Sequence, residues 1–184
     1  LQVYFIDNED YFHRKSVFYD KENNWHNDND ERAIFFCKGV LQTVRKLGWP
    51  PDIVHCNDWM TSLIPMYLKT TFKNDPIFMK AKTVFTIYNN GLDHKFNSNV
   101  IDKVKMIDID DNMLKNLATD DVEGFVKLGM EYADAVVSMN DDLKGELDKL
   151  FQTVETEEEK VIDTIDNSED FSESYYKLYN ELVG

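Results

Sequence analysis

The residues with the clearest chemical potential follow a short apolar run in the first third of the chain. Ile53-Val54-His55-Cys56 is followed at once by Asn57, Asp58 and Trp59, and Thr61 comes two residues later. Carboxylate, carboxamide, imidazole and hydroxyl groups can bind hydroxyls or move protons, and an indole ring offers a flat apolar surface. If the run is a strand and Asp58 caps a helix, the amides of that helix start can also receive an anion or a sugar hydroxyl. This segment is therefore the first candidate for a binding site.

Two of these side chains also have a purely structural interpretation. His55 can line a cleft or can be a hydrogen-bonded histidine inside a strand, and the sequence leaves both open. For Trp59 a buried core anchor is favoured over a sugar-stacking surface. The place of each ring relative to the sheet decides between these interpretations.

Apolar spacing predicts the elements that must position these residues. A three-to-four period predicts a helix from Glu31 to Leu47 that stops at Gly48, and the period returns from Val122 to Tyr132. Short apolar runs bounded by turn residues predict strands at Val3 to Ile6, Ile53 to Cys56, Lys82 to Tyr88 and Ala135 to Met139. Further helices are expected from Asp58 toward Phe72, from Leu143 to Leu150 and from Phe171 to Leu182.

Strands that alternate with helices favour a parallel sheet, so we expect an α/β fold with a Rossmann-like, doubly wound sheet over residues 1–150. In such sheets ligands bind where the strands end, which adds Asn89, after the Lys82 to Tyr88 strand, to the candidates. Residues 92–121 are expected to form a polar excursion with at most short helices. Residues 151–184 are expected to form an acidic, solvated linker followed by a tyrosine-rich terminal helix.

The charge balance argues against whole classes of partner. The 184 residues carry 35 acidic and 20 basic side chains, a formal net charge of −15, which repels nucleic-acid phosphates and anionic membrane surfaces. No run reaches the roughly 20 apolar residues that a membrane helix needs. Cys37 and Cys56 lack metal-ligand spacing and are expected to be free thiols in a reducing cytoplasm. We therefore expect no nucleic-acid or membrane partner and no metal bound by these cysteines.

Other common chemistries fail on missing motifs. The chain has no G-x-S-x-G nucleophile turn, no G-x-G-x-x-G loop and no phosphate-binding P-loop, which argues against serine hydrolase, hydride-transfer and P-loop phosphoryl-transfer mechanisms. The cluster Asp108, Asp110 and Asp111 lacks the loop glycine of a calcium site. A solvated acidic loop explains that cluster better.

The segment from Asp52 to Thr61 resembles the motif D-I-V-H-x-H-D-W-H-T of bacterial glycogen/starch synthases, which are retaining glucosyltransferases of the GT-B fold. Four more segments are similar to family motifs and keep their order along residues 3–150. They are Val3 to Arg14 (V-Y-F-L-D-x-x-x-Y-F-D-R), Asp28 to Phe36 (D-N-x-E-R-F-x-F-F), Thr83 to Asn89 (T-V-F-T-I-H-N) and Phe125 to Ser138 (F-L-K-A-G-x-x-Y-A-D-x-x-x-x-V-S, with small length differences).

The resemblance implies a function and a set of site residues. It implies cytoplasmic extension of an α-1,4-glucan from ADP-glucose, with UDP-glucose as an alternative donor and with no metal and no cofactor. α-Glucan and nucleotide sugar are therefore the implied ligands. The chain would supply a partial N-terminal Rossmann-like domain. The implied cleft residues are Asp28 and Asn29 on the acceptor side, with His55, Asp58, Trp59, Thr61 and Asn89. Asp28 can equally be a helix N-cap.

The departures from the family pattern limit what this chain can do. Asn57, Met60 and Tyr88 stand where the motifs have histidine, and His13 stands where aspartate is usual. A K-T-G-G-L loop and a second Rossmann domain, both typical of the family, are missing from the sequence. We therefore expect no complete catalytic set and no glucosyl transfer by this chain alone.

Two alternatives stay open beside a shortened, single-domain synthase. One is a non-catalytic glucan-binding or regulatory module, and the other is one half of a split synthase whose second GT-B domain lies in another chain. Because Leu1 leads directly into an apolar run, we also expect a fragment whose uncovered strand edges and apolar helix faces favour association.

Overall fold

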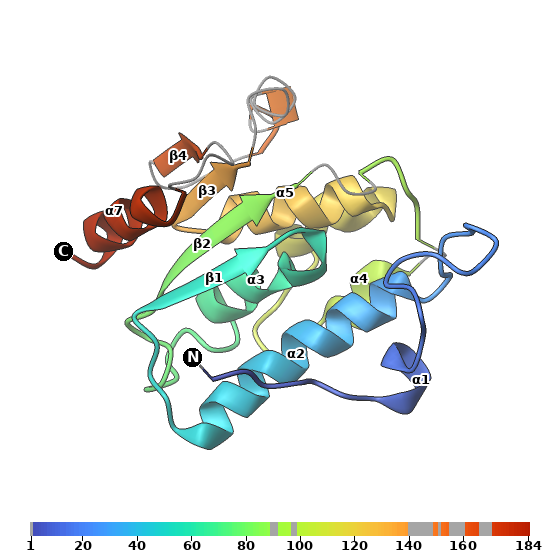
Figure 1. The fold of residues 1–184 in the computed structure, drawn as a ribbon, viewed down its shortest axis with the longest axis horizontal. Coiled ribbons are helices and arrows are strands. Elements are labelled where there is room, and N and C mark those ends of the chain that lie inside the picture. Colours follow the sequence, from blue (N-terminus) through green and yellow to red (C-terminus); the bar gives the residue numbers. More distant parts are fainter. Residues whose placement is uncertain are drawn as a thin grey trace.

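A four-stranded parallel sheet forms the centre of the molecule. The computed structural model describes residues 2–88, 92–96, 99–139, 149–150, 152–154, 161–165 and 171–184. The strands lie side by side in chain order, as Figure 1 shows: β1 (Ile53–Asn57), β2 (Lys82–Ile87), β3 (Ala135–Ser138) and β4 (Val161–Thr164). All three pairings are parallel. The predicted parallel α/β fold is confirmed.

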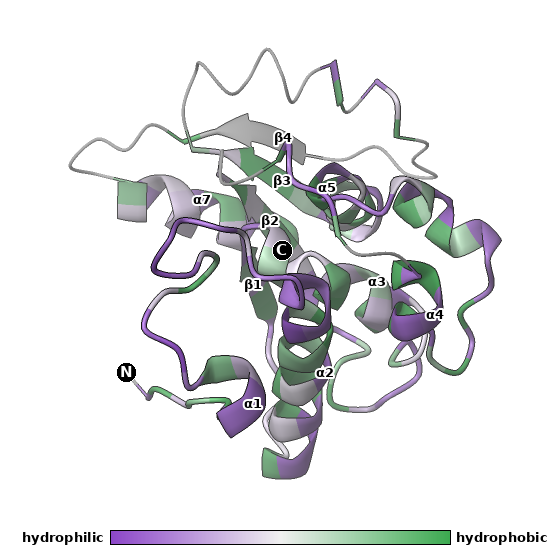
Figure 2. Ribbon diagram, turned by 90° about the vertical axis from the view of Figure 1, so that its right-hand side faces the viewer, coloured by the Kyte–Doolittle hydropathy of each residue, from purple (hydrophilic) through white to green (hydrophobic). Residues whose placement is uncertain are grey.

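Three helices share a hydrophobic core with one face of this sheet. α2 (Asn29–Leu47), α3 (Leu63–Lys69) and α5 (Val122–Tyr132) pack in one cluster with Cys56 and Phe85 of the strands. Hydrophobic residues gather on the strands and the helix surfaces against them, whereas the connecting loops are largely hydrophilic (Figure 2). No helix in the described ranges is both long and apolar enough to cross a membrane.

The other face of the sheet is covered by the C-terminal helix α7 (Phe171–Val183). Tyr175 and Leu178 of α7 pack in a second cluster with Val84 and Val137. Helices on both faces are the arrangement expected for a doubly wound fold, because parallel sheets bury both of their faces. The predicted terminal helix is confirmed.

Short helices fill the connections. Two of them, α4 (Val100–Val104) and the 3-10 helix η2 (Asn112–Thr119), lie in the polar excursion of residues 92–121, where short helices are expected. Two others are α1 (Glu9–Phe12) and the 3-10 helix η1 (Trp59–Thr61). The single helix predicted from Asp58 toward Phe72 is therefore divided into η1 and α3. Gly48 ends α2 with a φ of 68°, a left-handed conformation that glycine adopts without a steric penalty.

The strand predicted at residues 3–6 is wrong. This segment has no strand partner and instead lies along α2, where Ile6 packs against Gly39. The Tyr4 and Trp49 rings meet edge to face at 5.3 Å. Apolar composition alone does not make a strand, because a strand also needs a neighbour for its backbone hydrogen bonds.

The strand β4 was not predicted, since its four residues lie inside the stretch interpreted as an acidic linker. It pairs with β3 through residues Ala135 to Ser138, so the sheet continues past residue 150. The helix predicted at Leu143 to Leu150 falls almost entirely outside the described residues, as does Asn89.

The helix α5 approaches the sheet closely at Gly129. A Cβ atom at this position would lie 2.6 Å from Cε1 of Phe85, whose side chain is fully buried on β2. A contact this short requires one of the two elements to move. Gly129 thus allows α5 to pack closely against the sheet.

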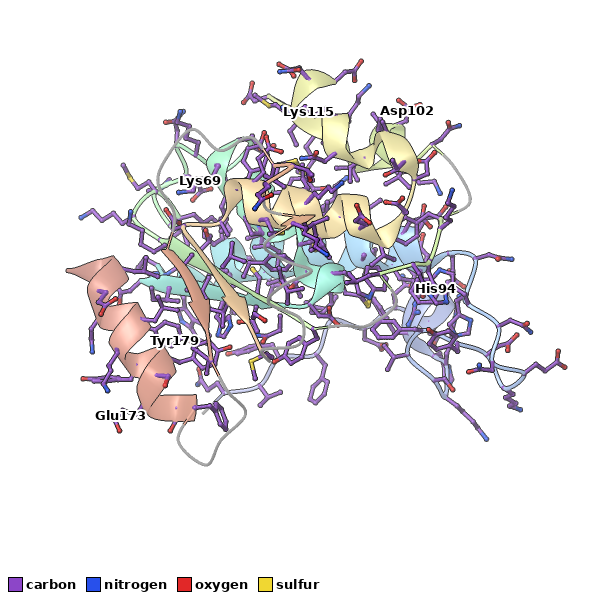
Figure 3. All side chains as sticks on the ribbon, turned by 90° about the horizontal axis from the view of Figure 1, so that it is seen from above. Lys69, His94, Asp102, Lys115, Glu173 and Tyr179 are labelled. Atoms are coloured by element: carbon purple, nitrogen blue, oxygen red, sulfur yellow. The ribbon has the colours of Figure 1, made fainter. Side chains whose placement is uncertain are left out.

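A chain of hydrogen bonds holds α7 to the sheet. Tyr179 Oη lies 2.6 Å from Nδ1 of His55, and Nε2 of His55 lies 2.7 Å from Oγ1 of Thr86. Thr86 Oγ1 lies 2.9 Å from Tyr175 Oη, which donates to Sδ of Met139 at 3.2 Å. Tyr179 lies on the side of α7 that faces the strands (Figure 3).

The thioether of Met139 sets the direction of this chain. A thioether sulfur only accepts, so the Tyr175 hydroxyl donates to it and accepts from Thr86. Thr86 in turn accepts from the Nε2–H of His55, which leaves Nδ1 to accept from Tyr179. The chain therefore holds His55 as one neutral tautomer.

We predict that Gly129→Ala destabilises the protein by about 1–3 kcal/mol, because the new methyl group overpacks the contact with Phe85. Gly39→Ala is the matched control. It lies within α2, and its methyl would meet only Cγ2 of Ile6, at 3.2 Å, which is longer than the 2.6 Å contact at Gly129. Both substitutions gain about 1 kcal/mol of helix propensity, so Gly39→Ala should be neutral or stabilising. Urea unfolding measures both, and equal stability of the two variants would contradict the packing argument.

We predict that protonation of His55 weakens the docking of α7. Burial lowers the pKa of His55 below the ordinary histidine value of about 6.5, so the unfolded chain takes up this proton more readily than the folded chain. The stabilisation is therefore present above about pH 6.5 and is lost as the pH falls through this range. The free energy of unfolding should fall more steeply on acidification in the wild type than in His55→Gln. Parallel pH profiles of the two proteins would argue against this account.

Candidate functional site

The carboxyl ends of β1 and β2 bring polar side chains together. Asn57 pairs with Thr86 in the register of the sheet, and Tyr88 follows Thr86 by two residues. The Tyr88 hydroxyl donates to Oδ1 of Asn57 at 3.4 Å, and Asp58 comes directly after Asn57. We call Asn57, Asp58, Thr61 and Tyr88 the strand-end group. It lies at the edge where open parallel sheets bind ligands.

Asp58 has a backbone conformation that normally requires glycine. Its φ is 64° and its ψ is 171°. The backbone is held there because the Asp58 N–H donates to the carbonyl of Thr86 at 2.8 Å and the carboxylate accepts from the N–H of Trp59 at 2.9 Å. Thr61 Oγ1 lies 2.9 Å from the carbonyl oxygens of both Asn57 and Asp58. Such a conformation costs about 1–3 kcal/mol and is found most often at functional sites.

Tyr88 brings a neutral hydroxyl to this group. Burial and the nearby charge of Asp58 both raise the pKa of Tyr88, so the phenol keeps its proton and remains a donor. The group thus offers a carboxylate, a carboxamide and two hydroxyls, which together can bind the hydroxyls of a polyol.

Trp59 lies in the core. Its side chain is fully buried among aromatic rings, with centroids 5.3 Å from Phe18, 5.6 Å from Trp25 and 5.8 Å from Phe96. Its Nε1 is buried without a hydrogen-bond partner among the described residues. The ring therefore has no open face for a sugar, in keeping with the core-anchor interpretation.

His55 lies away from the strand ends. Its ring is on the α7 face of the sheet, 4.8 Å from the ring of Tyr175, and both of its nitrogens are hydrogen-bonded. The structure therefore places His55 as a hydrogen-bonded histidine within a strand.

Asp28 and Asn29 anchor the loop of residues 13–28 to the start of α2. The Arg14 guanidinium binds both carboxylate oxygens of Asp28, at 2.7 and 2.5 Å. Burial would raise the pKa of Asp28, but the hydrogen bonds and charge of Arg14 outweigh it and lower the pKa. Asn29 is buried, donates to the carbonyl of Phe18 and accepts from Arg32. Asp28 is the N-cap residue of α2 by position, but its side chain makes no capping bond.

An aromatic cluster beside Trp59 was missed at the sequence level. His94 lies 4.3 Å from Trp25 between ring centroids, and its nitrogens lie 2.9 Å from Asp93 Oδ1 and 3.5 Å from Tyr19 Oη. Figure 3 shows His94 at the opposite end of the molecule from α7. The sequence feature that could have indicated this cluster is the high aromatic content of a loop without periodicity. Such content predicts that the loop packs against the protein, but it does not identify the residues that it contacts.

The structure thus joins only part of the predicted site. It brings Asp58 and Thr61 together with Asn57 and Tyr88, two residues that the sequence suggested only as departures from the family pattern. Asn89 lies outside the described residues. Within those residues, no group of three or more histidine, cysteine or acidic side chains could hold a metal ion.

Comparison with known proteins gives a consistent picture. The family model for the starch synthase catalytic domain matches residues 1–160. The chain is 36% identical over 142 residues to a glycogen synthase of Desulforudis audaxviator, covering 76% of this chain and 27% of that protein. It is 34% identical over 138 residues to a glycogen synthase of Clostridium botulinum strain Alaska E43, covering 74% of this chain and 28% of that protein.

A solved structure supports the fold. The catalytic domain of Starch Synthase IV from Arabidopsis thaliana, bound to ADP and acarbose, superposes with a TM-score of 0.54 over 77% of this chain and 30% of that chain, at 16% identity. At this identity the likeness shows the fold alone. The order of the motifs, the parallel sheet and the match over residues 1–160 agree, and the chain belongs to the starch synthase catalytic domain family.

Proposed function

We propose that this chain is the N-terminal part of a cytoplasmic, retaining glucosyltransferase that extends α-1,4-glucan from ADP-glucose, with UDP-glucose as the alternative donor. The observation that carries the proposal is the family match over residues 1–160, which includes the whole strand-end group. The related glycogen synthases support this choice of reaction. The chain spans 27% of the first of these relatives, so the activity of the whole protein remains part of the proposal.

The strand-end group has the chemistry to bind a glucan or glucosyl unit. The Asp58 carboxylate and the Asn57 carboxamide can accept from sugar hydroxyls, and the Tyr88 phenol can donate to one. Asn57 is exposed and Asp58 and Tyr88 are partly exposed, so a ligand can reach these groups. Stabilising a departing diphosphate needs cationic groups and backbone amides, and the K-T-G-G-L loop that would supply them is missing from the sequence. We therefore assign binding, without a complete catalytic set, to this chain alone.

A specific observation favours a second candidate, a non-catalytic glucan-binding or regulatory module. Asn57 and Tyr88 both replace histidines of the family motifs, and in the structure they bind each other. A paired carboxamide and phenol cannot shuttle protons near neutral pH as imidazoles do. The third candidate, a split synthase, needs a second GT-B domain from another chain.

We predict no measurable transfer of glucose from ADP-glucose or UDP-glucose to glycogen by this chain alone. The missing diphosphate contacts would raise the reaction barrier by several kcal/mol. A radiolabelled transfer assay on purified protein measures this, and Asp58→Ala serves as the control for contaminating enzyme. Turnover that disappears in Asp58→Ala would show that the chain is catalytic by itself.

A binding experiment tests the strand-end group separately. Amide shifts near Asp58 and Tyr88 on titration with maltooligosaccharides would support binding, whereas shifts confined to α7 would argue against this site.

We predict that Asp58→Ala and Asp58→Gly differ in stability but not in binding. Both lose the side-chain bond to the N–H of Trp59, but only glycine accepts a φ of 64° and a ψ of 171° without strain. The free energy of unfolding, measured with urea, should therefore be higher for Asp58→Gly than for Asp58→Ala by at least about 1 kcal/mol. Both should weaken maltooligosaccharide binding to a similar extent. Full binding by Asp58→Gly would mean that the carboxylate has no direct role.

A further inference from the structure

A pocket outside the strand-end group lies over the N-terminal half of α2. It has a volume of about 330 Å³, and its walls combine aromatic and aliphatic surface with two lysines and a glutamate. The lining residues are Tyr11, Glu31, Ile34, Phe35, Lys38 and Lys103. The Tyr11 and Phe35 rings lie 5.4 Å apart and form one side. None of these residues belongs to the strand-end group.

Most charges around this pocket are paired. Lys103 Nζ lies 2.7 Å from Oδ2 of Asp30 and 2.9 Å from Oε1 of Glu31. The other oxygen of Glu31 accepts from the Tyr11 hydroxyl at 3.2 Å. These contacts satisfy Lys103 and Glu31, so neither has a free charge to offer a ligand.

Lys38 is the exception. It is half-buried, its ammonium donates to the backbone carbonyl of Lys103 at 3.1 Å, and it lies 5.8 Å from the centre of the Tyr67 ring. Among the described residues no carboxylate forms an ion pair with it, although the chain carries 35 acidic side chains. Burial lowers the pKa of Lys38, as expected for a desolvated cation without a counter-charge. A partly buried charge is costly unless it is paired, so this position would gain from an anion.

We propose that this pocket binds a small organic anion, with a carboxylate or phosphate monoester against the Lys38 ammonium and a compact ring or alkyl body against Phe35 and Ile34. The uncompensated cation supplies the affinity for the anionic group, and the aromatic side of the pocket supplies apolar contact. The ligand is distinct from the glucan and nucleotide sugar of the strand-end group. The inference does not depend on the glucosyltransferase proposal.

The test uses the full chain and three probes of similar shape. Benzoate and phenyl phosphate present the two anionic groups, and benzyl alcohol is the neutral analogue. We expect both anions to shift the amide signals of Lys38 and Phe35 and to bind at least about ten-fold more tightly than benzyl alcohol, a difference of about 1.4 kcal/mol. The anion with the lower Kd shows whether the pocket prefers a carboxylate or a phosphate monoester. Absence of anion binding, or equal binding of benzyl alcohol, would overturn the proposal.

Variants of lysine separate this site from a general effect of charge. Lys38→Met keeps most of the aliphatic stem and should weaken anion binding about ten-fold, whereas Lys38→Arg should retain it. Lys177→Met on the exposed face of α7 removes one positive charge elsewhere and should leave binding unchanged. Thermal unfolding confirms that each variant is folded. Anion binding that survives in Lys38→Met, or that falls equally in Lys177→Met, would show that Lys38 does not form the site.

Discussion

The burial of both faces of the parallel sheet is the constraint on which the rest of the structure depends. Strands of a parallel sheet have no solvated face, so each face needs its own cover. On one face α5 comes close enough that only glycine fits at position 129 against Phe85. On the other face α7 contributes Tyr175 and Leu178. The family match ends at residue 160, so α7 covers this face from outside the matched range.

The sheet also fixes the geometry of the strand-end group. The N–H of Asp58 is held by the carbonyl of Thr86 on β2, and Tyr88 reaches Asn57 across the same pair of strands. Thr86 also takes part in the hydrogen-bond chain to α7 through its hydroxyl. Thr86 thus holds Asp58 through its backbone carbonyl and helps to dock α7 through its hydroxyl. A change in the docking of α7 would therefore reach the site through Thr86.

Periodic patterns predicted α2 and α5, because each helix has enough apolar residues on one side to define its partner face. Short apolar runs bounded by turn residues predicted β1, β2 and β3, and the tyrosine-rich C-terminal segment predicted α7. These patterns failed at residues 3–6, where an apolar run found no strand partner, and at β4, where four residues are too few to show a period. The motif at Asp58 indicated the strand end at which the candidate site is placed. The side of the sheet on which His55 lies, and the pairing of Arg14 with Asp28, depend on tertiary contacts between residues far apart in sequence, which local patterns do not encode.

The order of the strands has a consequence for how the chain reaches its native state. Because β1, β2, β3 and β4 are neighbours in chain order, each strand can join the sheet as soon as it has been synthesised. The contact between Tyr179 and His55 spans 124 residues and has to wait for the C-terminal helix. Loop closure over such a distance is slow, and the apolar face of β2 and β3 stays open to solvent until it happens. In a growing chain, that face is the surface on which a chaperone would act.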